Sequence, residues 1–173
     1  LELTLIALIV STVSGTIMGV IAALKQYSVY DYTLSIAALF GISIPTFFFA
    51  LLALYLFALV WPIFPFEGMS SPSRIGLGFS LGDHLHHLAL PLMVLCIDTM
   101  AGKTRYARTA MLEVMKSDYV TTARAKGLSN QAVIWRHAFR NALIPLITVT
   151  MLRLPGIFSG TLLIEFMFNW PGM

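Results

Sequence analysis

Two charged side chains interrupt the long apolar stretches of this sequence. Asp98 lies in the run 88–102 and Arg153 in the run 142–168, each roughly halfway through its predicted helix. A charge inside an apolar helix is costly, so such residues usually pair with each other or line a water-filled cavity. We therefore expect either that Asp98 and Arg153 form an ion pair or that one or both of them line a polar path.

Three histidines, His84, His86 and His87, stand just ahead of the run 88–102. Imidazole nitrogens are common metal ligands, so a metal site is one interpretation. No cysteine accompanies the histidines, and Asp83 is the one carboxylate beside them. We therefore expect solvated histidines at the end of the apolar run, and no metal site.

Motifs for nucleotide binding or metal-dependent hydrolysis are absent from the sequence. It contains no Gly-x-x-x-x-Gly-Lys-Ser/Thr loop and no His-Glu-x-x-His pair. The single cysteine, Cys96, sits in an apolar run, so neither a disulfide framework nor a thiol-rich metal site is available. We expect that this chain alone is not an enzyme.

The composition points to a lipid environment. Hydrophobic residues make up 58% of the 173 residues and charged residues 11%, against about 45–50% and about 25% in typical globular proteins. A soluble fold of this length has too small an interior to bury so much apolar surface. Because helices satisfy their own backbone polar groups in lipid, we expect an all-α integral membrane protein.

Four apolar stretches are candidates for membrane spans, since a spanning helix needs about 20 residues. They are 3–24, 34–60, 88–102 and 142–168, and the third is the shortest. Prolines inside the last three stretches are tolerated in membrane helices. In the first, the spacing of Gly15 and Gly19 is typical of closely packed neighbouring helices.

The basic residues are distributed unevenly among the connecting segments. Segment 25–33 holds Lys25, segment 61–87 holds Arg74, and the remaining loop, 103–141, holds Lys103, Arg105, Arg108, Lys116, Arg124, Lys126, Arg136 and Arg140. Cytoplasmic loops carry an excess of Lys and Arg. The counts therefore predict that 25–33 and 103–141 are cytoplasmic and that 61–87 is extracytoplasmic.

The loop 103–141 has an internal order that attraction to anionic lipid alone does not explain. Residues 103–116 continue the third span as a helix, and Ser117 or Asp118 is a suitable cap for a second helix over 119–126. Gly127 is placed to end that helix. A helix so short is stable only when packed against other structure, which is typical of a docking element.

A third helix is predicted after Gly127. Ser129 or Asn130 is a suitable cap, and the helix runs from Gln131 to about Asn141, where it enters the fourth span. The short helix is thereby held between two helical extensions of the spans.

The loop 103–141 and its flanks resemble those of a known family. The run Met111-Leu112-Glu113-Val114 … Asp118 to Leu128 … Arg136-His137-Ala138 … Arg140 to Pro145 resembles the EAA loop of binding-protein-dependent ABC importers, and more narrowly that of the dipeptide, oligopeptide and nickel permease group. The patches His87 to Pro91 and Glu165 to Gly172 agree. Thr121 stands where the general motif begins with Glu, and the distance from Gly127 to Pro145 is long, as in the peptide group.

The resemblance implies a type I ABC importer transmembrane domain in a bacterial or archaeal plasma membrane. Four of the family's about six spans would be present, so 1–173 would be a partial domain without the first span, the external loop after it, and the last span. The family's second span also runs outside to inside, which fits the orientation predicted from charge.

The resemblance further implies a coupling helix that sits in a groove of a cytoplasmic ATPase. Its residues would be Asp118, Tyr119, Thr122, Ala123, Arg124, Ala125, Lys126, Gly127 and Leu128. Ala123 and Ala125 would permit close approach, Gly127 a sharp turn, and the charged residues contacts at the groove rim.

The implied function is the membrane-spanning permease of an ATP-driven importer of dipeptides or oligopeptides delivered by an extracytoplasmic binding protein. ATP and Mg²⁺ would be bound by two partner ATPase subunits, and no cofactor by this chain. A second homologous permease and membrane lipid would be further partners, and nucleic acid would not. In this setting Asp98 and Arg153 would either pair or meet the charged termini of a peptide.

Three other functions are alternatives to a peptide importer. A nickel importer has the same kind of permease. An ion-coupled secondary transporter usually shows inverted repeats, and no repeat relates the halves of this sequence. An intramembrane enzyme needs a catalytic set within a span, which is absent.

Overall fold

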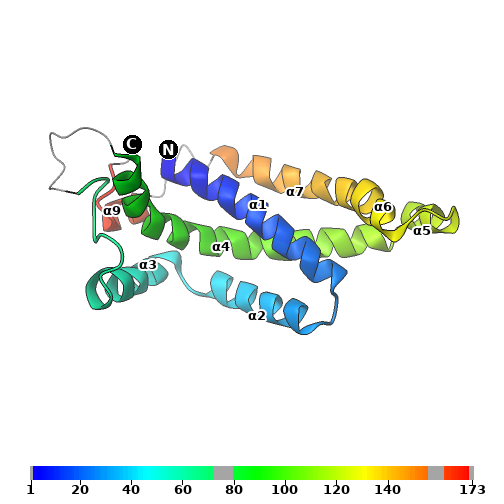
Figure 1. Ribbon diagram of the computed structural model, residues 1–173, viewed down its shortest axis with the longest axis horizontal. Helices are drawn as coiled ribbons and strands as arrows, with labels where there is room; N and C mark the ends of the chain where they lie inside the picture. The colour runs from blue at the N-terminus through cyan, green and yellow to red at the C-terminus, as the bar shows by residue number, and fades with distance from the viewer. Residues whose placement is uncertain (1, 72–79, 156–161, 172–173) are drawn as a thin grey trace. The chain divides into compact units, whose positions relative to one another are not determined.

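The computed structural model describes residues 2–71, 80–155 and 162–171. Within these ranges every regular element is a helix (Figure 1). The elements are α1 (Glu2–Leu24), α2 (Val29–Ser43), α3 (Thr46–Leu54), the π-helical segment η1 (Tyr55–Val60), α4 (Leu81–Met115), α5 (Asp118–Ala125), α6 (Asn130–Ala132), the π-helical segment η3 (Val133–Phe139), α7 (Arg140–Leu152) and α9 (Leu162–Met167). The all-α expectation is confirmed.

Within the described residues, the two helices α1 and α4 are long and apolar enough to cross a membrane. The pair formed by α2 and α3–η1 adds a third crossing if it is taken as one broken span. Helix α4 begins at Leu81, ahead of the apolar run that starts at residue 88, so it includes the polar segment that contains the histidines. It also continues to Met115, which confirms the predicted helical extension into the loop 103–141.

Proline divides two of the predicted stretches. Helix α2 ends at Ser43 and α3 begins at Thr46, with Pro45 as its N-terminal cap at φ −57° and ψ 133°. Proline disfavours helical backbone in the residue before it and clashes with the preceding turn. The stretch 34–60 is therefore not one continuous helix, although Pro91 and Pro145 are accommodated inside α4 and α7.

The predicted stretch 142–168 is also interrupted. Helix α7 ends at Leu152 and α9 covers Leu162–Met167, while residues 156–161 lie outside the described part of the chain. The interruption begins just before Pro155, whose ring clashes with a carbonyl group of the preceding turn. The backbone therefore leaves the helical pattern at Arg153, inside the predicted stretch.

The described helices belong to two compact units. Unit 1 comprises residues 1–10, 43–98 and 155–173, and unit 2 comprises residues 11–42 and 99–154. The core of unit 1 contains Leu3 and Ala7 of α1, Ala50, Ala53 and Leu54 of α3, Leu88, Leu90, Val94, Leu95 and Cys96 of α4, and Ile164, Phe168 and Trp170 at the C-terminal end. Segments distant in sequence thus share one apolar interior.

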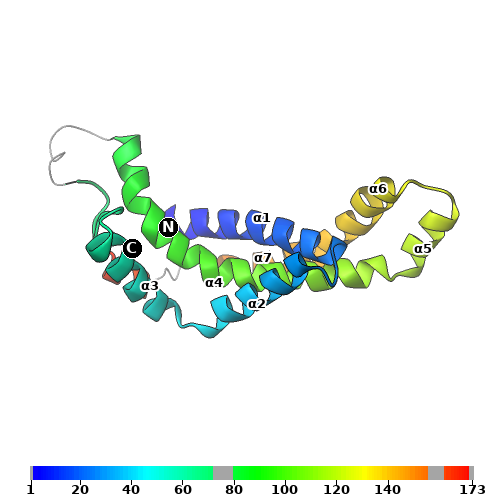
Figure 2. The ribbon, with the colours of Figure 1, turned by 60° about the horizontal axis from the view of Figure 1, so that its bottom comes forward.

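Unit 2 contains the loop 103–141. In Figure 2, α5 lies beyond the end of α4, and the run α6–η3–α7 returns beside α4. The core of this unit contains Ala23, Ala110, Met111, Val120, Ala123, Val133, Ala138 and Ala142. Most of these side chains are small, so the helices approach closely around the base of α5.

Candidate functional site

The start of α5 is fixed by polar contacts at Ser117. This residue is the N-cap in extended conformation, as predicted, but its hydroxyl donates to the carbonyl of Val114 at 2.5 Å instead of accepting from α5. Asp118 occupies the first turn, where a negative charge interacts favourably with the helix dipole. The hydroxyl of Thr122 donates to the Asp118 carbonyl at 2.8 Å. The predicted short helix is confirmed, whereas the capping bond takes a different form.

The end of α5 is a glycine-dependent turn. Gly127 has a φ of 78°, in the left-handed region. Its N–H donates to the carbonyl of Arg124 at 2.9 Å, and the N–H of Leu128 donates to that of Ala123 at 3.4 Å. This pair of bonds is the Schellman arrangement, which satisfies the last carbonyls of a helix. The prediction that Gly127 ends the helix is confirmed.

The two faces of α5 differ. Val120 is fully buried and Ala123 is 6% exposed, and both pack on the core of unit 2. The other predicted site residues are exposed, namely Asp118, Tyr119, Thr122, Arg124, Ala125, Lys126, Gly127 and Leu128. Ala123 therefore permits close packing inside this chain, not on the outer face. The outer face offers both signs of charge, hydroxyl groups and two apolar side chains.

The third predicted helix is present and begins as expected. The hydroxyl of Ser129 accepts from the N–H of Ala132 at 3.3 Å, so Ser129 is the cap. Beyond Ala132 the backbone becomes π-helical and then continues as α7. Val133 and Ala138 of η3 are both buried against α5 and its neighbours. Helix α5 is thus supported from both sides along the chain.

Helix α1 meets α4 through its glycines. A Cβ atom at Gly15 would lie 2.7 Å from the Lys103 Cβ and 2.9 Å from the Met100 carbonyl oxygen. At Gly19 it would lie 2.6 Å from the Cβ of Ala107. Such distances leave no room for a side chain, and the predicted close helix packing is confirmed.

A buried ion pair that the sequence did not reveal lies in the same unit. Nε of Arg108, on α4, donates to Oδ1 of Asp31, on α2, at 2.5 Å, and Nη2 donates to Oδ2 at 2.8 Å. Asp31 is 2% exposed and lies in segment 25–33, outside the predicted spans. No local sequence pattern indicates the pair, because its two residues lie far apart in the sequence. The available signal is that Asp31 is the one acidic residue in segment 25–33.

Lys103 also departs from its expected setting. It was counted among the basic residues of the loop, yet its side chain is 2% exposed. Its ammonium group donates to the hydroxyl of Thr150 on α7. That hydroxyl in turn donates to the Leu146 carbonyl at 2.8 Å. A buried lysine therefore links α4 to α7.

The two charges predicted inside spans occupy different settings. Asp98 is half-buried and lies midway along α4, as expected. Arg153 is exposed and is the C-cap of α7, where its N–H donates to the Thr150 carbonyl at 3.1 Å. Asp98 belongs to unit 1 and Arg153 to unit 2. Whether they pair or line a path stays a prediction.

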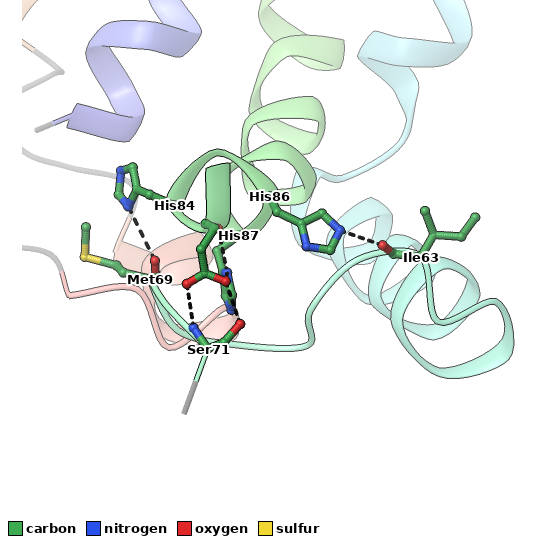
Figure 3. A network of polar contacts seen from close by, with 7 residues as sticks. Ile63, Met69, Ser71, His84, His86 and His87 are labelled. Atoms are coloured by element: carbon green, nitrogen blue, oxygen red, sulfur yellow. Dashed lines mark hydrogen bonds and ion pairs between the residues drawn. The ribbon is translucent and has the colours of Figure 1, made fainter. Parts of the chain in front are cut away.

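The histidines lie at the start of α4 (Figure 3). His84 Nδ1 lies 3.4 Å from the carbonyl oxygen of Met69, and His86 Nε2 lies 2.8 Å from that of Ile63. His84 and His87 are 8% and 5% exposed, and only His86 is exposed to solvent. The expectation of solvated histidines is wrong for His84 and His87. Met69 and the ring of Trp170 contact His84, and Nδ1 of His87 lies 2.9 Å from the Asp83 carbonyl oxygen of its own helix.

The same region carries further polar contacts. Asp83 accepts from the N–H of Ser71 at 2.8 Å and from its hydroxyl at 2.6 Å. His84 Nε2 lies 2.8 Å from Oε1 of Glu2 on α1. Across the described ranges, no group of three histidine, cysteine or acidic side chains is arranged to hold a metal ion. The contacts fasten segment 61–71 to the start of α4.

The sequence is similar to those of known membrane transport proteins. The sequence profile of the binding-protein-dependent transport system inner membrane component matches residues 15–173. The oligopeptide transport system permease protein AppB of Bacillus subtilis (strain 168) is 37% identical over 174 residues, covering 98% of this chain and 54% of AppB. The dipeptide transport system permease protein DppB of the same strain is 39% identical over 172 residues, covering 99% and 52%. A putative peptide permease protein of Brucella suis biovar 1 (strain 1330) is 43% identical over 166 residues, covering 96% and 51%.

The chain spans about half the length of these relatives. The profile match and the apolar helices together make it a multi-pass membrane protein with the helical fold of a type I ABC importer transmembrane domain. The relatives named above are all permeases. The chain therefore belongs to the family of binding-protein-dependent ABC transporter permeases.

Proposed function

We propose that this chain is part of the membrane-spanning permease of an ATP-driven importer that translocates peptides delivered by an extracytoplasmic binding protein. The observation that carries the proposal is α5, a short helix that ends in the Gly127 turn and keeps one face exposed while the other is buried. Peptides are favoured as the solute because the relatives described above are named for dipeptide, oligopeptide or peptide transport.

In this function the exposed face of α5 docks in a groove on a cytoplasmic ATPase. Arg124, Lys126 and Asp118 make charge-assisted contacts with polar groups at the groove rim. Leu128 and Tyr119 add apolar area to the same contact. Closure of the ATPase pair upon ATP binding then displaces α5 and the helices packed on it.

Nucleotide is bound by the ATPase subunits in this scheme. The tripeptide Gly102-Lys103-Thr104 lies inside α4, with Lys103 and Thr104 buried, so it does not form a phosphate-binding loop. ATP and Mg²⁺ therefore bind to two partner ATPases. A second homologous permease completes the path, and segments 25–33 and 103–141 face the cytoplasm.

Reconstitution tests the proposal. The full-length permease is co-expressed with its second permease and both ATPases, purified, and placed in proteoliposomes with the binding protein. Uptake of radiolabelled dialanine, a labelled pentapeptide and radioactive Ni²⁺ is measured with and without ATP. We expect the ATPases to co-purify and peptide uptake to require ATP. Uptake of Ni²⁺ alone would support the nickel importer, and uptake driven by an ion gradient without ATP would identify a secondary transporter.

A further inference from the structure

The turn between α1 and α2 depends on one carboxylate. Asp31 Oδ2 accepts from the N–H of Tyr27 at 3.0 Å, and the N–H of Asp31 donates to the hydroxyl of Ser28 at 3.3 Å. Tyr27 has a φ of 63°, which is uncommon for a residue other than glycine. The carboxylate that Arg108 grips therefore also holds the unusual conformation of this turn.

Arg108 lies on the helix that leads into α5. It precedes the end of α4 at Met115 by about two turns, or about 10 Å. Helix α5 begins at Asp118, directly after the end of α4. A displacement of α5 is thus transmitted along α4 to Arg108 over a short, regular stretch of helix.

An apolar core and an ion pair connect α5 and the C-terminal part of α4 to α1 and α2 in this unit. The first is the apolar core, in which Ala23 of α1 packs with Ala110, Val120 and Ala123. Such contacts are non-directional, and alanine side chains interlock little. The second is the bidentate bond between Asp31 and Arg108, which fixes both distance and orientation. The ion pair is therefore a directional connection between α2 and α4.

The energetics of buried ion pairs favour a positional role. The side chain of Asp31 is 3% exposed and that of Arg108 is 27% exposed. Desolvation of the carboxylate offsets much of the attraction between the two charges, so such a pair adds little net stability compared with apolar side chains of similar size. Asp31 is nearly fully buried, and its carboxylate oxygens accept three hydrogen bonds. The ion pair therefore fixes the position of α2 relative to α4 while adding little to the free energy of folding.

We propose that Asp31 and Arg108 form a positioning pair that transmits the displacement of α5 to the turn 25–28 and so to α1 and α2. This inference rests on the proposed function, because it assigns the pair a part in coupling ATP hydrolysis to transport. The pair touches neither the ATPase nor the solute. Its loss lowers the amount of peptide moved per ATP hydrolysed while the transporter still assembles.

The experiment uses the complete transporter in proteoliposomes with labelled dialanine as the probe. Asp31→Asn removes the negative charge and keeps the shape of the side chain. Arg108→Lys keeps the positive charge but cannot donate two parallel hydrogen bonds to one carboxylate. Glu113→Gln, an exposed acidic residue on α4, is the matched control. Uptake and ATP hydrolysis are measured on the same vesicles and normalised to the assembled complex.

We expect Asp31→Asn to lower the ratio of peptide transported to ATP hydrolysed by about fivefold or more, a typical size for coupling between sites. Arg108→Lys should give an intermediate ratio and Glu113→Gln the wild-type ratio. If both pair variants assemble with an unchanged ratio, or if both fail to assemble, the pair is merely structural and the inference is wrong. A wild-type complex without ATP-dependent peptide uptake instead overturns the proposed function itself.

Discussion

Gly127 ends α5 in a backbone conformation that residues with a Cβ atom resist. Left-handed φ costs such residues roughly 1–2 kcal/mol. We expect Gly127→Ala to loosen the end of α5, and Gly127→Val to do so more strongly. Transport-stimulated ATP hydrolysis should fall in both variants while membrane insertion is unchanged, as measured by ATPase assays and membrane fractionation.

Gly102 provides the matched control for that prediction. It lies inside α4, and apart from its chain neighbours and the backbone of its own helix no atom lies within 4 Å of the position a Cβ would take. Alanine is a better helix former than glycine, so Gly102→Ala should leave coupling intact. Undiminished coupling in Gly127→Ala would show that the left-handed turn is dispensable.

Thr150 accepts a hydrogen bond from the buried ammonium group of Lys103. Hydrogen bonds to charged groups contribute about 1.5–3 kcal/mol, and Thr150→Val removes this acceptor. We expect a clear fall in the thermal unfolding temperature of the detergent-purified protein. Thr148→Val, an exposed change on the same helix, should have little effect. Equal stability of the two variants would mean that Lys103 finds another partner.

The contact of α1 with α4 leaves no space for larger side chains at its glycines. A Cβ at Gly19 would lie 2.6 Å from the Ala107 Cβ and 2.9 Å from the Arg108 nitrogen. Overpacking typically costs about 1–3 kcal/mol, and backbone atoms cannot move aside easily. Gly19→Val should therefore lower the yield of folded protein, as judged by size-exclusion chromatography. Val13→Leu, on an exposed face of α1, should not.

The sequence predicted the elements of unit 2 better than their contacts. Helical continuation to Met115, the short helix α5 and its stop at Gly127 follow from local signals in hydropathy, capping and glycine. The burial of Ala123 depends on which face of α5 meets the core, which local spacing does not specify. The Asp31–Arg108 pair joins residues far apart in sequence, so no local pattern indicates it.

Proline and histidine positions show the same limit in unit 1. The helix breaks at Pro45 because proline disfavours helical backbone in the residue before it, but hydropathy alone does not distinguish such a break from a tolerated proline such as Pro91. His84 was expected to be solvated, and its burial follows from tertiary contacts with Met69 and Trp170.

For the molecule as a whole, the predicted orientation is testable by cysteine labelling. Ser70→Cys lies in the predicted extracytoplasmic segment, and Lys116→Cys lies in the predicted cytoplasmic loop; both positions are exposed. A membrane-impermeant maleimide should label Ser70→Cys in right-side-out vesicles and Lys116→Cys in inside-out vesicles. The native Cys96 is 8% exposed and should stay unlabelled. The reverse labelling pattern would invert the topology.

The core beneath α5 also has a consequence for biosynthesis. It joins Ala23, made early, to Ala142, which leaves the ribosome well after α5 itself. Until the start of α7 has emerged, α5 lacks part of the surface that supports it. If α5 docks on an ATPase as proposed, we expect a nascent chain truncated before that point to be unable to capture the ATPase, so that recruitment waits until the start of α7 has been translated.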